Sequence, residues 1–123
     1  PAFRHVSVIP GLPHGHIWTF PEVDAFVDHV LRGGAPLAQP GPVRLSLASA
    51  TVQVASPAPV RKATLNYTTD SGPWQKRAWK SMPATIHRTK ISANLPSERP
   101  LVAFFLLEDA RGIRTSSEHF LLP

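Results

Sequence analysis

The sequence has 123 residues and a mass of 13.4 kDa, which fits one domain of ordinary size, with or without a short appendage. It is 42% hydrophobic but holds 14 prolines and 7 glycines, so it is apolar enough to fold and too interrupted for a helix bundle. No apolar run approaches the roughly 18 to 20 residues of a membrane span, and without cysteine there is no disulfide or thiolate metal site.

The net charge of +5 is distributed unevenly. Residues 1–40 carry 2 basic and 3 acidic side chains, a net of −1, whereas residues 41–123 carry 11 basic and 5 acidic ones, a net of +6. This asymmetry indicates two structural units. The basic residues alternate with apolar ones, as on the solvent face of strands, and no recognised binding motif accompanies them, so we expect no nucleic-acid partner.

The first 40 residues predict a strand, a loop and a helix. Residues 2–9, AFRHVSVI, predict a short strand that ends at a Pro-Gly turn signal. Residues 11–20 hold two glycines, two histidines and a tryptophan without a period, which is typical of a loop. Residues 21–32 predict a helix, with proline and acidic residues in its first turn and basic residues in its last. Gly33 ends this helix, and a proline-rich linker follows.

One face of the predicted helix is apolar. Five side chains follow the spacing i, i+3, i+4, i+7 and i+8: Val23, Phe26, Val27, Val30 and Leu31. Because exposing each large apolar side chain costs about 1.5 to 3 kcal/mol, another part of a protein must cover this stripe.

From residue 41 onward the pattern changes to period two with turn signals every eight to twelve residues or so, which predicts an antiparallel β-sandwich of six or seven strands with no helix longer than about two turns. The candidate strands are 43–50, 51–55, 61–69, 74–82, 87–95, 101–109 and 113–122. The segment 101–108 is apolar on both faces and is expected to be a central strand. We assign Tyr67, Trp74 and Trp79 to the core or its edge, with a sugar-stacking platform as the alternative.

The densest group of chemically active side chains is the Pro13-His14-Gly15-His16 loop. Two histidines at this spacing can chelate a metal, but a metal site needs three or four ligands and the loop offers no third, so we expect neither a metal nor another cofactor. The order strand, histidine loop, helix is instead where several hydrolases with an open α/β sheet place their general base.

Two stretches carry a resemblance to a known family. Residues 3–37, FRHVSVIPGLPHGHIWTFPEVDAFVDHVLRGGAPL, resemble the last strand, histidine loop and final helix of the α/β-hydrolase fold, in the branch of prolyl-oligopeptidase-like, acetyl xylan esterase-like and dienelactone hydrolase-like enzymes. The block from GPWQKRAWKSM to SSEHFLLP looks like the small fibronectin III/Ig-like β-sandwich that some secreted members carry after the hydrolase domain. The resemblance implies a mainly β chain in two parts, a hydrolase element over 1–38 and a β-sandwich over 41–123.

The resemblance implies that His14, with His16 as the alternative, is the general base of a serine esterase or peptidase. The chain contains no Gly-x-Ser-x-Gly motif, and in this family the nucleophile and the acid precede the histidine. The partner is then the remainder of the hydrolase domain, on an upstream polypeptide or a second chain, and the substrate is an ester or a peptide. We expect a processed or excised piece, because residue 1 is proline, and an extracytoplasmic location, as in the secreted members.

A different interpretation is a non-catalytic β-sandwich that binds carbohydrate or protein and carries an N-terminal helical appendage. The two interpretations differ in what covers the helix stripe. The binding module needs the stripe to pack on its own sandwich, whereas the hydrolase needs it to cover a sheet supplied by other residues.

The remaining polar residues are given structural roles. Asp109, Arg111 and Glu118 are expected to be solvated turn and strand residues, and the helix dipole explains Glu22 and Asp24. The other histidines, which have no partner that spacing can identify, are also left structural: His5, His29, His87 and His119.

Overall fold

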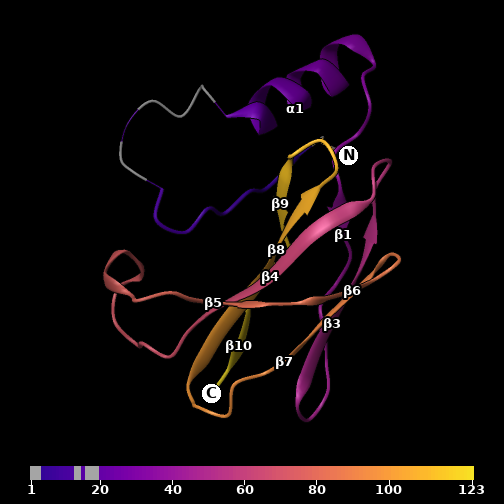
Figure 1. Cartoon of the computed structure of the whole chain (residues 1–123). Helices are drawn as coiled ribbons and strands as arrows, with labels where there is room; N and C mark the ends of the chain where they lie inside the picture. Colours follow the sequence, from indigo (N-terminus) through magenta and orange to yellow (C-terminus); the bar gives the residue numbers. More distant parts are fainter. Residues whose placement is uncertain (1–3, 13–14, 16–19) are drawn as a thin grey trace.

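A computed structural model describes residues 4–12, 15 and 20–123. Within these residues the chain has one α-helix and ten short strands in two antiparallel sheets, so the expected mainly β, sandwich-like architecture is confirmed (Figure 1). The helix α1 (Pro21–Arg32) lies at one end of the two sheets (Figure 1). No helix of the described residues is long and apolar enough to cross a membrane.

Each sheet has five strands. The first runs in the order β1-β3-β7-β6 with β2 also on β3, and the second runs β10-β8-β4-β5 with β9 also on β8. The strands of the first sheet are β1 (Gln39–Pro40), β2 (Arg44–Leu45), β3 (Ser49–Ala55), β6 (Thr85–His87) and β7 (Lys90–Asn94). The strands of the second sheet are β4 (Val60–Thr68), β5 (Lys80–Pro83), β8 (Leu101–Asp109), β9 (Arg114–Ser116) and β10 (Phe120–Leu122).

The core lies between the two sheets and follows from the period-two pattern. Alternate residues of β3, such as Val52 and Val54, are buried, while Gln53 between them is exposed. From the second sheet, Leu65 of β4 and its register partner Phe105 of β8 enter the same cluster, both fully buried. The burial of these side chains between the sheets explains the alternation of apolar and polar residues in 41–123, in which the basic residues lie on the solvent-exposed faces.

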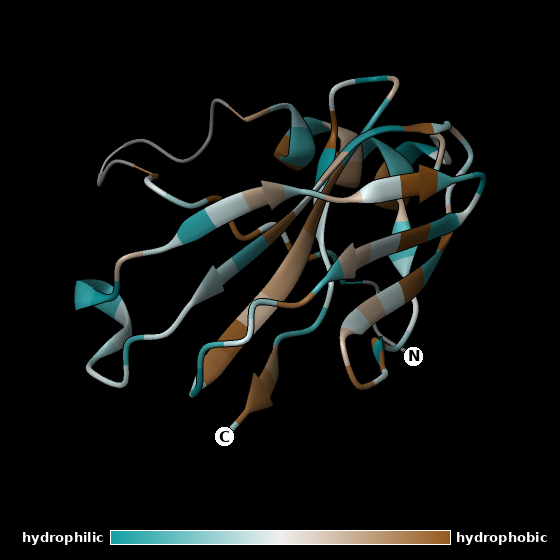
Figure 2. Cartoon of the chain, turned by 60° about the horizontal axis from the view of Figure 1, so that its bottom comes forward, coloured by the Kyte–Doolittle hydropathy of each residue, from teal (hydrophilic) through white to brown (hydrophobic). Residues whose placement is uncertain are grey.

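Strand β8 is buried on both faces, as its composition predicts. Figure 2 shows it as a nearly continuous hydrophobic strand. Phe105 points into the core, whereas Phe104 points to the opposite face of the sheet, where the rings of Trp79 and His119 pack against it. The outer face of this sheet is therefore covered as well, and this cover forms part of the candidate site.

The number of strands is larger than the six or seven expected, because several predicted strands are interrupted. Trp74–Lys76 is a single 3-10 turn, η2, so the predicted strand 74–82 begins only at Lys80. Arg88 has a φ of 56° in a two-residue turn, which divides 87–95 between β6 and β7. The break at Ser117–His119 divides 113–122 between β9 and β10. The 3-10 turn is the longest helix in 41–123, so the expectation of no long helix there is confirmed.

The predicted strand 2–9 is wrong for the described residues 4–9, which have no regular secondary structure. This segment runs beside β9 but is held largely by side chains. The amide of Ser116 donates to the Val6 carbonyl at 2.9 Å, and the Val8 amide donates to the Ser116 hydroxyl at 2.7 Å. A hydroxyl takes the place of a backbone carbonyl as acceptor, so a ladder does not develop.

The predicted helix is confirmed. Pro21 occupies its first turn, and Gly33, with a φ of 72°, ends it in the left-handed conformation that glycine adopts without strain. The sandwich follows after a short linker: Leu37 and Ala38 are already buried, and β1 pairs with β3 from Gln39. The division into parts at 1–38 and 41–123 stays a prediction.

Much of the helix stripe is not covered by the sandwich. The fraction of the side chain left exposed is 41% at Val27, 39% at Val30 and 75% at Leu31. Phe26 and Val23 are partly buried, and the single fully buried residue of the helix is charged, Glu22. The apolar side of α1 is thus largely open to solvent.

Candidate functional site

The two predicted catalytic histidines, His14 and His16, lie outside the described residues. Their assignment therefore stays a prediction, and the candidate site consists of the described segments on either side of them together with the part of the sandwich that they contact. Residues 4–12 lead into the histidine loop, and residues 20–32 lead out of it.

One residue of the sandwich, Arg114 at the start of β9, binds both of these segments. Its backbone carbonyl accepts a hydrogen bond from the Ser7 hydroxyl and lies 3.0 Å from Nε2 of His5. Its amide donates to Oε1 of Glu22 at 2.9 Å, and its guanidinium Nε donates to the same oxygen at 2.7 Å. The guanidinium also lies over the ring of Phe20, 5.5 Å from its centre. Both ends of the histidine loop are thus fixed to one strand.

The Glu22–Arg114 ion pair is shielded from water. Glu22 is only 5% exposed. Burial on its own would raise the pKa of Glu22, but the hydrogen bonds and the positive charge of Arg114 outweigh it, so the pKa of this carboxyl is lowered. The same hydrogen bond raises the pKa of Arg114. The prediction that the helix dipole explains Glu22 is therefore incomplete, because the main partner of this carboxylate is Arg114, 92 residues away in the sequence.

The contact between His5 and Ser7 resembles the histidine–serine contact of a catalytic triad, but here the histidine does not act as a base toward the serine. Nε2 of His5 lies 3.0 Å from the Ser7 hydroxyl oxygen and equally close to the Arg114 carbonyl. Because a carbonyl only accepts, the ring nitrogen is the donor to it, and the Ser7 proton points to the same oxygen. Burial lowers the pKa of His5 more than this hydrogen bond and the charge of Glu22 raise it. The pair holds the segment in place and leaves no base lone pair for Ser7.

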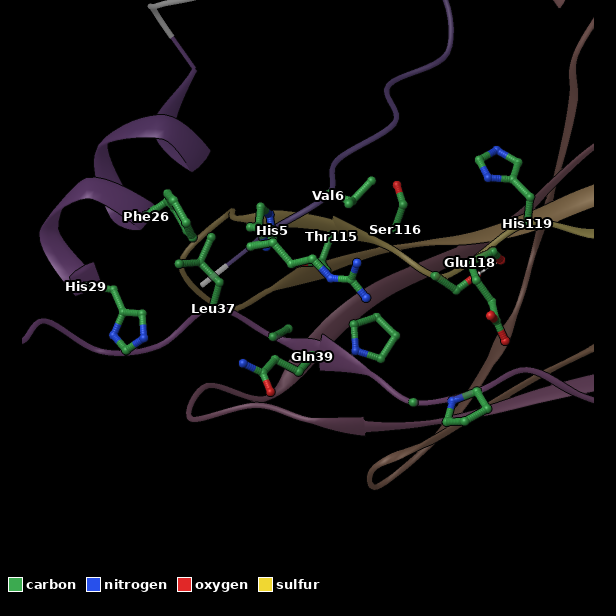
Figure 3. A pocket seen from close by; sticks show the side chains of 16 residues that line it. His5, Val6, Phe26, His29, Leu37, Gln39, Thr115, Ser116, Glu118 and His119 are labelled. Carbon is green, nitrogen blue, oxygen red and sulfur yellow. Dashed lines mark hydrogen bonds between the residues drawn. The ribbon is translucent and has the colours of Figure 1, made fainter. Parts of the chain in front are cut away.

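A groove of about 700 Å³ separates α1 from the sandwich (Figure 3). Phe26 and His29 of the helix line one side, and Leu37 and Thr115 line the sandwich side. The ring nitrogen Nδ1 of His29 lies 2.8 Å from the Gly34 carbonyl. Thr115 is buried, and its hydroxyl has no hydrogen-bond partner among the described residues. The groove is thus partly polar and open, and its lining also includes Ser116 and Glu118, whose side chains accept hydrogen bonds from the amides of Val8 and Val43.

A second, more apolar pocket of about 400 Å³ lies on the outer face of β8. Four aromatic rings line it, those of Trp74, Trp79, Phe104 and His119. The ring centres are 5.6 Å apart for Trp74 and Trp79, 5.4 Å for Trp79 and Phe104, and 4.6 Å for Phe104 and His119. Trp74 also meets His119 edge to face at 5.4 Å. Loss of hydration lowers the pKa of His119, so its ring is neutral at neutral pH.

The rest of the lining of this aromatic pocket is the segment that leads into the histidine loop. It consists of Val8, Ile9, Pro10, Gly11 and Leu12. Leu12 is two residues before His14 in the sequence and is 42% exposed. The prediction of the core or its edge fits Trp79, which is partly buried against Phe104, whereas Trp74 is 50% exposed. The one sequence feature that could have indicated this pocket is the position of Trp74 directly after the turn Asp70–Pro73.

Of the three polar residues expected to be solvated, Asp109, Arg111 and Glu118, the first differs from the prediction. Asp109 is buried, not solvated: its carboxylate accepts from the Arg111 guanidinium at 2.7 Å and from two amides of its own turn. Glu118 is exposed and accepts from the Val43 amide at 2.9 Å. Among the described residues no three histidine, aspartate or glutamate side chains come close enough to hold a metal ion.

The chain was compared with protein-family models, with curated proteins and with solved structures, and none of these comparisons gives a match.

Proposed function

We propose that this chain is the C-terminal part of a serine hydrolase of the α/β-hydrolase type, in which His14 is the general base and the β-sandwich is an accessory domain. The serine and the acid of the triad would come from residues outside this sequence, on an upstream polypeptide or a second chain. The reaction would be acyl transfer to water at an ester or peptide carbonyl. His14 would take the serine proton during attack and return it to the leaving group.

The observation that carries this proposal is the open face of α1. The hydrolase interpretation requires the apolar stripe to cover a sheet built by other residues, whereas a free-standing binding module requires it to pack on its own sandwich. Val27, Val30 and Leu31 all remain substantially exposed beside that sandwich. At about 25 cal/mol for each Å² of apolar surface left in water, such a stripe favours a covering partner.

The fixed ends of the histidine loop provide further support. A general base has to be held within hydrogen-bonding reach of its nucleophile, so the elements that carry it must be rigid. His5 and Ser7 before the loop, and Glu22 after it, all bind Arg114 of β9. The sandwich would thus help to position the loop in which the proposed base lies.

The test is activity of the chain together with its upstream part on 4-nitrophenyl acetate, which does not depend on knowing the natural acyl group. His14→Ala should lower turnover by several powers of ten, as removal of a triad member does, and His16→Ala should do far less. The reverse ranking would move the base to His16. Near-normal turnover in both variants, or turnover by the pure 123-residue chain, would show that the function proposed here is wrong.

The second candidate is a non-catalytic binding module, and the aromatic pocket is the observation in its favour. The half-exposed Trp74 lies beside Trp79 on a fixed sheet face, an arrangement that binds ligands without any catalysis. The open helix face counts against it. Ligand binding by the isolated chain together with no effect of His14→Ala on a complete protein would favour this candidate.

A further inference from the structure

We propose that the aromatic pocket between the Trp74–Trp79 loop and residues 8–12 is a substrate subsite that takes a flat, uncharged apolar ring, such as an aryl group of an ester. The assignment of the ring to a substrate rests on the function proposed above. The binding of the ring to the pocket does not, and it can be tested separately.

The exposed indole is held in place before any ligand arrives. The Trp74 ring contacts Trp79 and His119, and the Arg77 guanidinium lies 4.7 Å from its centre. Arg77 is itself fixed by a hydrogen bond from its Nε to the Gly72 carbonyl at 2.7 Å. The Ala78 amide, in the same loop, donates to the carboxylate of Asp70 at 2.7 Å. A residue that is 50% exposed yet positioned by so many contacts loses little further freedom when a ligand contacts it.

The lining decides which chemical class fits. The pocket is formed by apolar side chains, aromatic rings and the glycine of residues 8–12, and no carboxylate or cation is among its lining residues. The polar side-chain groups are limited to the His119 ring and the two indole N–H groups. A sugar ring of the same size would bury several hydroxyls without partners, and each unpaired hydroxyl costs about 1 to 3 kcal/mol. An apolar ring has no such cost, and a volume of about 400 Å³ is ample for one ring and its linkage.

The location ties the pocket to the proposed chemistry. The segment that lines it ends at Leu12, two residues before His14 in the sequence. A ring seated in the pocket would therefore leave the rest of a small ester close to the histidine loop. The sandwich would then contribute to substrate selection and not only to support.

The direct test follows the indole N–H signals of the ¹⁵N-labelled 123-residue chain by NMR. Trp18, Trp74 and Trp79 give three signals, which Trp74→Phe and Trp79→Phe assign. Titration with benzyl alcohol should shift the Trp74 and Trp79 signals saturably, with a Kd of about 1 to 10 mM for so small a ligand. Trp74→Ala should weaken this binding about fivefold, measured on the Trp79 signal. Leu47→Ala, which removes another exposed apolar side chain that is not among the lining residues of the pocket, should leave the Kd unchanged.

Methyl β-xyloside is the matched sugar probe. Shifts absent up to about 50 mM benzyl alcohol, or a xyloside that binds as well as benzyl alcohol or better, would overturn the assignment to an apolar ring. If benzyl alcohol binds but His14→Ala leaves hydrolysis intact, the pocket stands and the hydrolase proposal fails. If it does not bind and His14→Ala abolishes hydrolysis, the hydrolase proposal stands and the pocket fails.

A kinetic measurement on the complete hydrolase tests the link to the substrate. Trp74→Ala should raise KM about fivefold for an ester whose ring occupies the pocket, with little change in kcat and no change for ethyl acetate. An effect on phenyl acetate would place the alcohol part of the substrate in the pocket, and an effect on methyl benzoate would place the acyl part there. An unchanged KM for both aryl esters would overturn the substrate role.

Discussion

The sandwich and the helix that precedes it bury their apolar side chains to different extents. In the sandwich, large residues such as Leu65, Ile91 and Phe105 are fully buried against one another. In α1, the apolar residue nearest the C-terminal end, Leu31, is 75% exposed, and the residue that anchors the helix is the charged Glu22. Burial of its own apolar side chains thus stabilises the sandwich. The helix is attached to the sandwich through polar contacts of Glu22, and its apolar side is largely exposed.

The largest effect should come from the sandwich core. Phe105→Ala removes a fully buried ring between the two sheets and should lower the free energy of unfolding by about 3 to 5 kcal/mol, because it removes apolar contacts and leaves a cavity. Chemical denaturation measures this. Leu47→Ala, at an exposed position in the loop before β3, is the control and should change the stability by less than about 0.5 kcal/mol. Similar losses in the two variants would contradict a core closed on itself.

The second effect should be confined to the helix junction. Glu22→Gln keeps the size of the side chain but removes its charge, and hydrogen bonds to charged groups contribute about 1.5 to 3 kcal/mol each. Amide hydrogen exchange in α1 should therefore accelerate about 10- to 100-fold, while β4 and β8 keep their protection. Asp24→Asn, an exposed position in the same turn, is the matched control. Equal acceleration throughout the sandwich would show that the two regions unfold as one unit.

The pH dependence should be more modest and should involve both regions. The pKa of His5, at the junction, and that of His119, on the outer sheet face, are both lowered by burial, so the folded state prefers their neutral forms. The stability they contribute is present above the pKa of about 6.5 that a histidine has in the unfolded chain, and it is lost as the pH falls through the lower folded values. Unfolding free energies measured from pH 7.5 to pH 5 should therefore decrease.

The variants His5→Asn and His119→Gln should each reduce the slope of that decrease. A further decrease, below the pKa of an unfolded glutamate, should follow protonation of Glu22, whose pKa is lowered in the fold. A stability that rises on acidification from pH 7.5 to pH 5 would contradict the direction of both histidine shifts.

The smallest effect is expected at the open face of the helix. Leu31→Ser should change the stability of the isolated chain by less than about 0.5 kcal/mol, because the side chain is already mostly in water. The same change should weaken association with an upstream hydrolase part, measured as the Kd between the two pieces or as loss of co-purification. A clear loss of stability in the isolated chain would mean that its own sandwich covers this face.

The elements with strong local signals could be predicted from the sequence. The helix 21–32 has a proline at its start, a glycine after its end and a regular stripe, and 101–109 is apolar enough to be buried on both faces. Both predictions are confirmed because local sequence and tertiary packing favour the same structure. The failures lie where side chains replace backbone partners, as for residues 4–9 beside β9, or where a turn divides a period-two run, as at Arg88.

The candidate site was much less predictable. The partner of Glu22 is Arg114, 92 residues away, and no spacing rule connects them. His119 had no partner that the sequence could identify, but the register of β10 and the break before it bring its ring onto Phe104 and Trp74. Such contacts depend on how the sheets close. His14 and His16 were assigned from their loop and the family resemblance, and that assignment stays a prediction.

The attachment of both loop ends to Arg114 has a consequence for how this segment could change during evolution. The chain between the anchors at Ser7 and Glu22 forms a closed loop of about fourteen residues, and the entropy of closing a flexible loop rises only with the logarithm of its length. Doubling the loop would cost about 0.6 kcal/mol, far less than the loss of either anchor. Insertions between the anchors therefore cost little stability, and the length of this segment could change while the sandwich stays unchanged.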